Sequence, residues 1–523
     1  MILHEAFIKR ARGNGKKMAI IDGTTGQKAT YSKSLIVTLL FAELFSSYED
    51  KFIGLMIPTS AGGYLATMGV LASGKVPVMI NYSTGADENC KYAQQTCGFR
   101  TIVTSKALCE KIGCPKVDGM IYLEELAESF SKMAKIKALV KSKLPLKMIL
   151  SKLPATSEDD TACILFTSGS ESEPKAVQLS HKNIGSNVED IISLAKLTEK
   201  DRIMNTLPVF HVFGLTTGFW VPMLSCMVIT YANPLELKNI VKLIINEKPT
   251  LIPSTPSFLA GYLKQSKPGD FESLRLIVPG GDKTPEWLRK AFRETHNIEL
   301  MEGYGTTETS PVISVNTPEA NKPGSVGKAV PHAKIKITDV ETGEELGAGE
   351  EGKILVKGDL VMKGYFDDLE ATSLRVRDGW YDTGDMGYLD KDGFLWHSGR
   401  LKRFAKIGGE MISMIRTERM LEKLLPDGVE CCVIELPDPK KGARIMAAVT
   451  EPVNKEVIIR ELSKTLPALA IPSSFEVIPE MPKMGNGKIN FRQVTNTFKE
   501  KHISHLKNSA SAHKSKAHTE NKF

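Results

Sequence analysis

Residues 162–175 read ACILFTSGSESEPK, an apolar run followed by a turn rich in serine, glycine and glutamate. The apolar run is typical of a buried strand. Hydroxyl and glycine residues after a strand can wrap hydroxyls and backbone N–H groups around phosphate oxygens. The stretch is not a P-loop, because Pro174 precedes Lys175 and Ala176 follows it. It indicates an anion-binding turn in an α/β fold, and a serine-rich surface turn is the alternative.

The sequence around this stretch supports the α/β class. From about Lys17 to Val330, short apolar runs such as FIGLMIP at 52–58 alternate with helical patterns such as YLATMGVLASG at 64–74. This alternation favours layered α/β structure with largely parallel sheets. We therefore predict two layered α/β subdomains within a large N-terminal domain, residues 1–400.

The pattern changes after Val330. Short strand-like runs separated by Gly, Asp and Glu turns continue to about Trp396, which predicts a small β-barrel-like subdomain at the end of the large domain. Residues 401–498 are typical of a compact α+β domain. The remaining residues, 499–523, are rich in Lys, His, Ser and Ala, and we expect a disordered basic tail.

A second block with chemical potential is EGYGTTE at 302–308. Its glycines permit close backbone approach, Tyr304 can stack on a base, and the Glu308 carboxylate can hold Mg²⁺. A turn before a helix is the alternative interpretation.

Two further blocks follow. WYDTGD at 380–385 precedes GRLKR at 399–403, and the carboxylate of Asp385 suits a ribose diol while Arg400 suits phosphate or ribose oxygens. PKMGNGK at 482–488 is a glycine-rich loop that presents Lys488. By itself that loop is also typical of a hairpin tip.

In this order the blocks resemble the adenylate-forming superfamily, which includes acyl-CoA synthetases, firefly luciferase and the adenylation domains of peptide synthetases. The resemblance runs from TYSKSL at 30–35 to about Lys488. Finer features point to one branch, because several stretches resemble the acyl-acyl carrier protein synthetase module of bacterial 2-acylglycerophosphoethanolamine acyltransferases. These stretches are TSGSE, LPVFHVFGLT, KPGSVG and especially GRLKRFAKIGGEM. Ser172 and Ala176 stand where that superfamily usually has Gly, which puts turnover rate in doubt more than the reaction.

The resemblance implies that ATP and Mg²⁺ activate a fatty acid as acyl-AMP. The acyl group then passes to the phosphopantetheine thiol of an acyl carrier protein, or to coenzyme A, and a mobile C-terminal domain rotates between the steps. The implied roles are catalytic for Lys488, Lys175, Glu308 and Thr306; metal binding for Glu308; nucleotide binding for Thr167, Ser168, Gly169, Ser170, Lys175, Gly280, Gly281, Tyr304, Gly305, Thr306, Asp385 and Arg400; acyl binding for Phe210, His211, Phe213 and Gly303; and hinge for Lys402.

Two alternatives stay open. One is a long- or medium-chain fatty acyl-CoA synthetase of the same fold. The other, from a different class, is a non-catalytic nucleotide-binding or membrane-scaffold protein. The charges at Lys175, Glu308, Asp385, Arg400 and Lys488 argue against the second, since a protein without catalysis has no physical need for all five.

Composition limits the partners. The net charge is +7, which favours acidic partners, and no nucleic-acid-binding pattern accompanies it. Residues 131–154 carry seven Lys and no acid, with apolar residues at helical spacing. This stretch predicts a basic surface for anionic lipid or for an acidic carrier protein, and a solvated linker helix is the alternative.

Cysteine usage and the N-terminal sequence bear on the compartment. The eight Cys have no zinc-type spacing, so we expect reduced, mostly buried thiols. The charged N-terminus lacks the apolar region of a signal peptide, and no run of 18 apolar residues occurs. These features predict a cytoplasmic protein, with peripheral contact at the inner face of the membrane through 131–154 left open.

Overall fold

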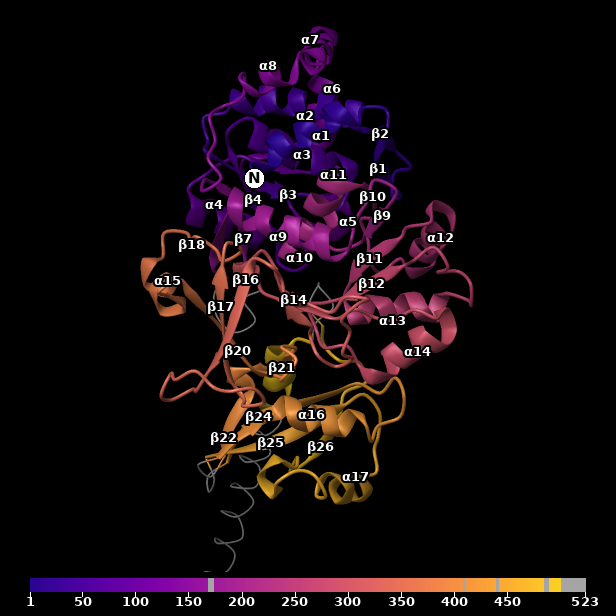
Figure 1. Cartoon of the computed structure of the whole chain (residues 1–523), viewed down its shortest axis with the longest axis vertical. Coiled ribbons are helices and arrows are strands. Elements are labelled where there is room, and N and C mark those ends of the chain that lie inside the picture. The colour runs from indigo at the N-terminus through magenta and orange to yellow at the C-terminus, as the bar shows by residue number, and fades with distance from the viewer. Residues whose placement is uncertain (168–173, 408–409, 439–441, 484–488, 500–523) are drawn as a thin grey trace, which may run out of the picture.

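The computed structural model describes residues 1–167, 174–407, 410–438, 442–483 and 489–499. Within these ranges two large α/β sheets are followed by a β-rich part and by a smaller α+β unit at the opposite end of the molecule (Figure 1). The predicted α/β class with a small C-terminal unit is confirmed.

The first large sheet has seven strands in the order β18-β8-β7-β4-β3-β5-β6. The pairs from β7 to β6 are parallel, and β8 pairs antiparallel with both of its neighbours. Strands β3 and β4 are uninterrupted apolar runs, as expected for parallel strands covered on both faces. The strands are β3 Phe52–Met56, β4 Val76–Met79, β5 Ile102–Thr104, β6 Met120–Tyr122, β7 Thr161–Phe166, β8 Ala176–Ser180 and β18 Gly364–Tyr365.

The second large sheet has six strands in the order β12-β11-β9-β10-β1-β2. Its pairs are parallel except at the edge, where β2 runs antiparallel to β1. Parallel strands bring their carboxyl ends to one edge of a sheet, where binding sites of α/β proteins lie. The strands are β1 Met18–Asp22, β2 Lys28–Thr30, β9 Arg202–Asn205, β10 Met227–Thr230, β11 Leu251–Ser254 and β12 Leu276–Pro279.

Helix α3, Ala61–Ala72, forms a buried layer between the two sheets. It is apolar all round, and it contacts β1 of one sheet and β4 of the other. It also packs closely on helix α2, Tyr31–Ser46. A Cβ on Gly69 would lie 2.3 Å from the Cβ of Phe41, so glycine is required where the two helices touch.

Other helices cover these sheets and connect their strands. They are α1 Leu3–Gly13, α4 Ala86–Cys97, α5 Lys106–Ile112, α6 Leu123–Ser129, α7 Lys132–Lys143, α8 Leu146–Leu150, α9 His181–Leu194, α10 Val212–Leu215, a π-helical turn Thr216–Trp220, α11 Val221–Ser225, α12 Leu237–Glu247, α13 Pro256–Gln265 and α14 Glu286–His296.

The β-rich part contains a three-stranded sheet, β13-β14-β15, and a five-stranded sheet, β16-β17-β20-β19 with β21 paired to β20. The register of the β20–β21 pair places Asp385 directly opposite Arg400. The elements are β13 Gly303–Gly305, the 3₁₀ turn Thr307–Thr309, β14 Val312–Val315, β15 Lys328–Ala329, β16 Ala333–Thr338, β17 Gly352–Gly358, α15 Leu369–Arg375, β19 Val376–Arg377, β20 Trp380–Leu389 and β21 Leu395–Arg400.

The C-terminal unit follows the 3₁₀ turn Leu401–Arg403 and has its own core, centred on residues such as Val433 and Ala447. It contacts the larger part of the chain through a Lys283–Glu422 ion pair at 2.5 Å and through Arg419, which donates to the backbone carbonyl of His397. The elements are β22 Phe404–Ile407, β23 Glu410–Ser413, α16 Met414–Glu422, β24 Cys431–Asp438, β25 Gly442–Val449, α17 Lys455–Leu462, the 3₁₀ turn Ala468–Ala470 and β26 Phe475–Val477.

The cysteines and the apolar character of the helices bear on two expectations from the sequence. All eight cysteines are unpaired and seven of them are buried, which agrees with the expectation that most are buried. In the described ranges, no helix combines the length and the apolar character that crossing a bilayer requires.

A pair of buried histidines packs the N-terminal helix onto α9. The rings of His4 and His181 meet edge to face at 5.4 Å, and the Leu3 N–H donates to His181 Nδ1. Burial lowers the pKa of His4 to about 4 and, helped by the neighbouring His4, that of His181 to about 3. Both rings are therefore neutral in the folded protein at neutral pH.

This pair predicts an acid-sensitive contribution to stability. Below the unfolded pKa of about 6.5 the unfolded chain binds protons that the folded chain does not, so stability falls with pH down to the folded pKa. At about pH 5 each histidine should contribute roughly 2 kcal/mol of this loss. We expect His4→Leu to reduce the drop in Tm between neutral pH and about pH 5, measured by differential scanning calorimetry. An unchanged drop in the variant would contradict this assignment.

Candidate active site

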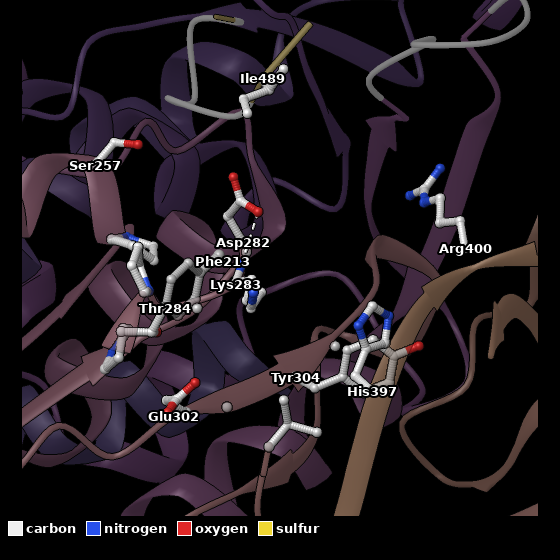
Figure 2. Close-up of a pocket in the computed structure, with 18 of the residues that line it drawn as sticks. Phe213, Ser257, Asp282, Lys283, Thr284, Glu302, Tyr304, His397, Arg400 and Ile489 are labelled. Carbon is white, nitrogen blue, oxygen red and sulfur yellow. Dashed lines mark hydrogen bonds between the residues drawn. The ribbon is translucent and has the colours of Figure 1, made fainter. Parts of the chain in front are cut away.

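A cavity of about 2580 Å³ lies where the carboxyl ends of β11 and β12 face β13, β20, β21 and the C-terminal unit. Figure 2 shows part of it, with Phe213 and Asp282 on one side and Tyr304, His397 and Arg400 on the other. Every predicted site residue that the structure describes lines this cavity: Thr167, Lys175, Phe210, His211, Phe213, Gly280, Gly281, Gly303, Tyr304, Gly305, Thr306, Glu308, Asp385, Arg400 and Lys402. Ser168, Gly169, Ser170 and Lys488 lie outside the described residues.

Asp385 is the centre of a polar cluster on one wall. The Tyr304 hydroxyl donates to Asp385 Oδ2 at 2.6 Å, and His397 Nε2 lies 3.6 Å from the same oxygen. The rings of Tyr304 and His397 lie side by side, with centroids 4.9 Å apart. Arg400 Nε lies 3.7 Å from the other oxygen, Oδ1. The cluster joins β13, β20 and β21.

The Asp385 carboxylate is buried yet ionised. Burial opposes its ionisation, but His397, Arg400 and the Tyr304 hydroxyl outweigh burial and lower the pKa of Asp385. Its Oδ1 is buried and accepts no hydrogen bond from the described residues. A buried carboxylate oxygen without a donor is costly, so this atom suits a ligand hydroxyl. The cluster therefore fits the predicted ribose diol.

A second cluster surrounds Glu308, in the 3₁₀ turn after β13. Glu308 Oε1 accepts a hydrogen bond of 2.9 Å from the Tyr365 hydroxyl. The Lys175 ammonium lies 4.7 Å from the centre of the Tyr365 ring, within the range of a cation–π contact. Tyr365 thus connects the carboxylate predicted to hold Mg²⁺ with the lysine predicted to bind phosphate.

Backbone contacts position both of these predicted motifs. Thr167 and Lys175 exchange two bonds of 3.0 Å: the Thr167 N–H donates to the Lys175 carbonyl and the Lys175 N–H to Thr167 Oγ1. These bonds bring the two ends of segment 168–173 together at the cavity. At Gly305 a Cβ would lie 1.8 Å from the Pro311 carbonyl oxygen, so glycine is required there.

A buried ion pair lies beside these clusters. Arg289 Nη1 is 2.9 Å from Glu302 Oε1, and the Gly324 N–H donates to the same oxygen at 3.2 Å. Burial raises the pKa of Glu302, and the Arg289 charge only partly opposes that rise. Glu302 lines the cavity, but its oxygen is already satisfied by protein groups.

Part of the cavity wall is apolar. Leu251 and Pro253 on β11, like Leu276 and Val278 on β12, alternate along their strands and line the same side of the sheet. Ile203 on β9 and residues Ile191 and Leu194 on α9 complete the walls. The four residue steps from Leu276 to Gly280 correspond to about 13 Å. The polar clusters and this apolar part, here called the channel, thus belong to one cavity.

Phe210, His211 and Phe213 also line the cavity. His211 begins α10, where its Nδ1 accepts from the Phe213 N–H at 3.3 Å. Phe210 meets Tyr82 edge to face with centroids 4.8 Å apart. Directly after β12, a Cβ at Gly280 would lie 3.1 Å from the Phe213 ring, so glycine there allows the ring to pack closely.

The segment that contains Lys488 begins and ends at the same cavity. Lys483 and Ile489 pair as an antiparallel β-bridge, and both line the cavity. Figure 2 shows Ile489 above Asp282. The two residues that flank segment 484–488, which contains the predicted catalytic lysine, are therefore at the site.

Sequence reasoning missed Tyr365 and His397. Tyr365 lies in MKGYF at 362–366, and nothing in this stretch indicates a contact with the predicted metal ligand Glu308. His397 is three residues before the predicted Arg400, and pairing the WYDTGD strand with the following strand could have revealed it.

Two family models match the chain. The AMP-binding enzyme model matches residues 7–366, and the AMP-binding enzyme C-terminal domain model matches residues 423–488. The long-chain-fatty-acid–CoA ligase of Bacillus subtilis is 32% identical over 368 residues, which are 67% of this chain and 64% of that protein. The match therefore spans slightly less than two thirds of that relative. 4-coumarate–CoA ligase 1 of Petroselinum crispum is 26% identical over 93% of this chain and 92% of that protein.

Solved structures share the fold along nearly the whole chain. ATP-bound MatB from Rhodopseudomonas palustris has a TM-score of 0.82 at 22% identity, covering 95% of this chain and 99% of that one. o-Succinylbenzoate CoA synthetase (MenE) from Bacillus subtilis, in complex with its acyl-adenylate intermediate, has a TM-score of 0.81 at 25% identity, covering 94% and 97%. With a family model matching residues 7–366, the chain belongs to the AMP-binding enzyme family, the adenylate-forming superfamily.

Proposed function

We propose that this protein is an AMP-forming acid–thiol ligase that activates a fatty acid as acyl-adenylate and transfers the acyl group to a thiol. The observation that carries the proposal is one cavity that is lined both by a buried, ionised carboxylate and by apolar residues of β9, β11, β12 and α9. A nucleotide and an aliphatic acid can meet there.

The polar clusters suit ATP, the cosubstrate of adenylate-forming enzymes. Asp385 Oδ1 would accept a ribose hydroxyl beside Arg400, and the Tyr304 ring and the Gly280–Gly281 backbone would flank the adenine. Lys175 and Thr306 would contact phosphate oxygens, together with residues 168–170. Each of these residues that the structure describes lines the cavity.

Glu308 is the proposed protein ligand of Mg²⁺. Mg²⁺ in nucleotide sites commonly takes one or two carboxylates and fills its other positions with phosphate oxygens and water. A single carboxylate at the phosphate side fits that pattern. In such a site Mg²⁺ neutralises charge on the phosphates.

In the first reaction step the fatty carboxylate oxygen forms a bond to the α-phosphorus of ATP, and the bond from that phosphorus to the pyrophosphate oxygen breaks. Two anions approach each other, so preorganised positive charge is the main requirement. Lys488, in the segment between Lys483 and Ile489, would supply it. In the second step a thiolate attacks the acyl carbonyl carbon and AMP leaves.

The apolar channel supports a fatty acid as the substrate. Phe210, His211, Phe213 and Gly303 would lie around the carboxyl end, and the chain would extend between α9 and strands β9, β11 and β12. Burial of each methylene contributes about 0.8 kcal/mol, which favours medium or long chains over short acids.

The channel predicts a chain-length effect of Val278→Trp. Because Val278 lies midway along β12, an indole there should block the channel and lower kcat/KM for palmitate roughly a hundredfold, while shorter acids lose much less. Val340→Trp is a matched control, since Val340 is exposed and does not line the cavity. Pyrophosphate exchange with acids of graded length measures the effect, and equal losses at every length would exclude the channel.

We further propose an acyl carrier protein as the thiol acceptor. The support is the similarity of GRLKRFAKIGGEM to the acyl carrier protein synthetase module. Coenzyme A is the second candidate acceptor, because the similar proteins named above are CoA ligases.

We also propose that residues 401–498 rotate about Lys402 relative to residues 1–400 between the two steps. The rotation would withdraw Lys488 from the cavity and admit the thiol.

The test is thioester formation by the purified protein with palmitate, ATP and Mg²⁺, offering holo-acyl carrier protein and coenzyme A in parallel. Product on the carrier protein supports the proposed acceptor. Product on coenzyme A alone would show that the protein is a fatty acyl-CoA ligase. Absence of pyrophosphate exchange with any fatty acid would overturn the proposed activity and favour a non-catalytic nucleotide-binding or membrane-scaffold protein.

A further inference from the structure

Helix α7, Lys132–Lys143, lies at the end of the molecule opposite the C-terminal unit (Figure 1). It begins at Ser131, whose hydroxyl caps the helix by accepting from the Ala134 N–H at 3.1 Å. No residue from 93 to 165, all of which the structure describes, lines the active-site cavity. The surface of α7 is therefore separate from the site.

One face of α7 is fixed against helix α2. Ala138 and Ser142 are 2% and 4% exposed, and small side chains at this spacing let the two helices pack closely. Just before the helix, the ring of Phe130 meets that of Phe41 edge to face at 5.5 Å. Lys137 also forms an ion pair of 2.5 Å with Glu43 on α2. These contacts fix which side of α7 faces outward.

The outward face is apolar. Met133, Ile136 and Val140 recur at helical spacing and are 72%, 55% and 57% exposed, and Leu139 beside them is 43% exposed. Single exposed apolar side chains are normal, whereas a contiguous group on a rigid helix marks a contact surface. Met148 on α8 is exposed on the same segment.

Lysines flank this apolar stripe on both sides. At 100° per residue, Lys132, Lys135 and Lys143 fall on one side of Met133, Ile136 and Val140, the side that also holds Leu139. Lys137 and Lys141 fall on the other side. Residues 131–154 contain no acidic side chain. Nearby acids are Glu43, which pairs with Lys137, and the exposed Glu125 and Glu128 on α6. On α7 itself every charged side chain that borders Met133, Ile136 and Val140 is therefore a lysine.

We propose that α7 docks this protein onto an anionic lipid surface. Met133, Ile136, Leu139 and Val140 would enter the boundary between headgroups and acyl chains, and the flanking lysines would contact lipid phosphates and carboxylates. An acidic carrier protein fits less well, because its pantetheine thiol has to reach the cavity and α7 lies at the far end of the molecule (Figure 1). The inference does not depend on the proposed ligase activity.

The test is co-flotation of the full chain with vesicles of phosphatidylcholine alone and of phosphatidylcholine mixed with phosphatidylserine. We expect binding to the mixed vesicles that falls at high salt, and little binding to the neutral ones. Ile136→Glu with Val140→Glu should lower the partition coefficient at least about tenfold. The matched control is Val457→Glu with Ile459→Glu, exposed apolar residues of α17 that are 43% and 39% exposed and should leave binding unchanged.

A second variant tests the charge separately. Lys132→Glu, Lys135→Glu and Lys143→Glu together should also abolish binding to the mixed vesicles, because each lysine near an anionic surface contributes attraction. Circular dichroism confirms that both variants fold. Undiminished vesicle binding in either variant overturns the proposal, since residues elsewhere, such as the basic segment 499–523, would then provide the attachment. If the parent protein does not bind vesicles and these variants lose activity with the carrier protein, α7 would be assigned to a protein partner instead.

Discussion

Lys488→Ala should abolish formation of the acyl-adenylate while sparing transfer of the acyl group from supplied acyl-adenylate to the thiol. A cation preorganised between two anions is worth about 3 kcal/mol or more in the transition state, so adenylation should fall by at least about a hundredfold. The position of the neighbouring chain supports this role, because Lys483 and Ile489 pair with each other and both line the cavity. Pyrophosphate exchange measures the first half-reaction, and thioester formation from synthetic acyl-adenylate measures the second.

Lys483→Ala is the matched control for this loop. Lys483 lies at the base of the same segment, but it forms an ion pair of 2.6 Å with Glu430 in the C-terminal unit. An exposed pair of this kind contributes little to stability, so the variant should fold and retain adenylation within a few-fold of the parent. Equal loss of both half-reactions in Lys488→Ala, or equal defects in the two variants, would contradict the assignment of Lys488.

The sequence predicted the layers of the fold well because they depend on local patterns. Continuous apolar runs such as 52–58 and 162–166 became β3 and β7, central strands of a sheet that is parallel over most of its width. The glycine-rich and acidic blocks were also predicted to meet, and the residues that the structure describes in them line one cavity. The turn 168–170 and Lys488 lie outside the described residues, so their roles stay predictions.

Contacts between strands that are distant in the sequence could not be predicted from local sequence patterns. Tyr365 reaches Glu308 because β18, at the edge of the first large sheet, pairs with β8 directly after the Lys175 turn. His397 reaches Asp385 through the register of β20 and β21. Likewise, the apolar residues of 131–154 predicted an amphipathic helix, but only its packing on α2 shows which side is buried and which is exposed.

Glu308→Gln should have the second largest effect. Within the described residues the Glu308 carboxylate accepts a hydrogen bond from the neutral Tyr365 hydroxyl, so its negative charge is available to a cation. Glutamine keeps the shape and the hydrogen bond but removes the charge that would hold Mg²⁺ beside the phosphates. We expect pyrophosphate exchange to fall at least about a hundredfold, and the Mg²⁺ concentration for half-maximal rate to rise.

Glu302→Gln provides the contrast that isolates this charge. Glu302 lines the same cavity, but it is buried and paired with Arg289 at 2.9 Å. Removing one partner of a buried pair leaves an uncompensated charge, so this variant should lose about 3 kcal/mol of stability while its Mg²⁺ dependence stays that of the parent. Thermal unfolding and Mg²⁺ titration of both variants separate the two roles. If the Mg²⁺ dependence shifts in Glu302→Gln and not in Glu308→Gln, the metal ligand has been assigned to the wrong carboxylate.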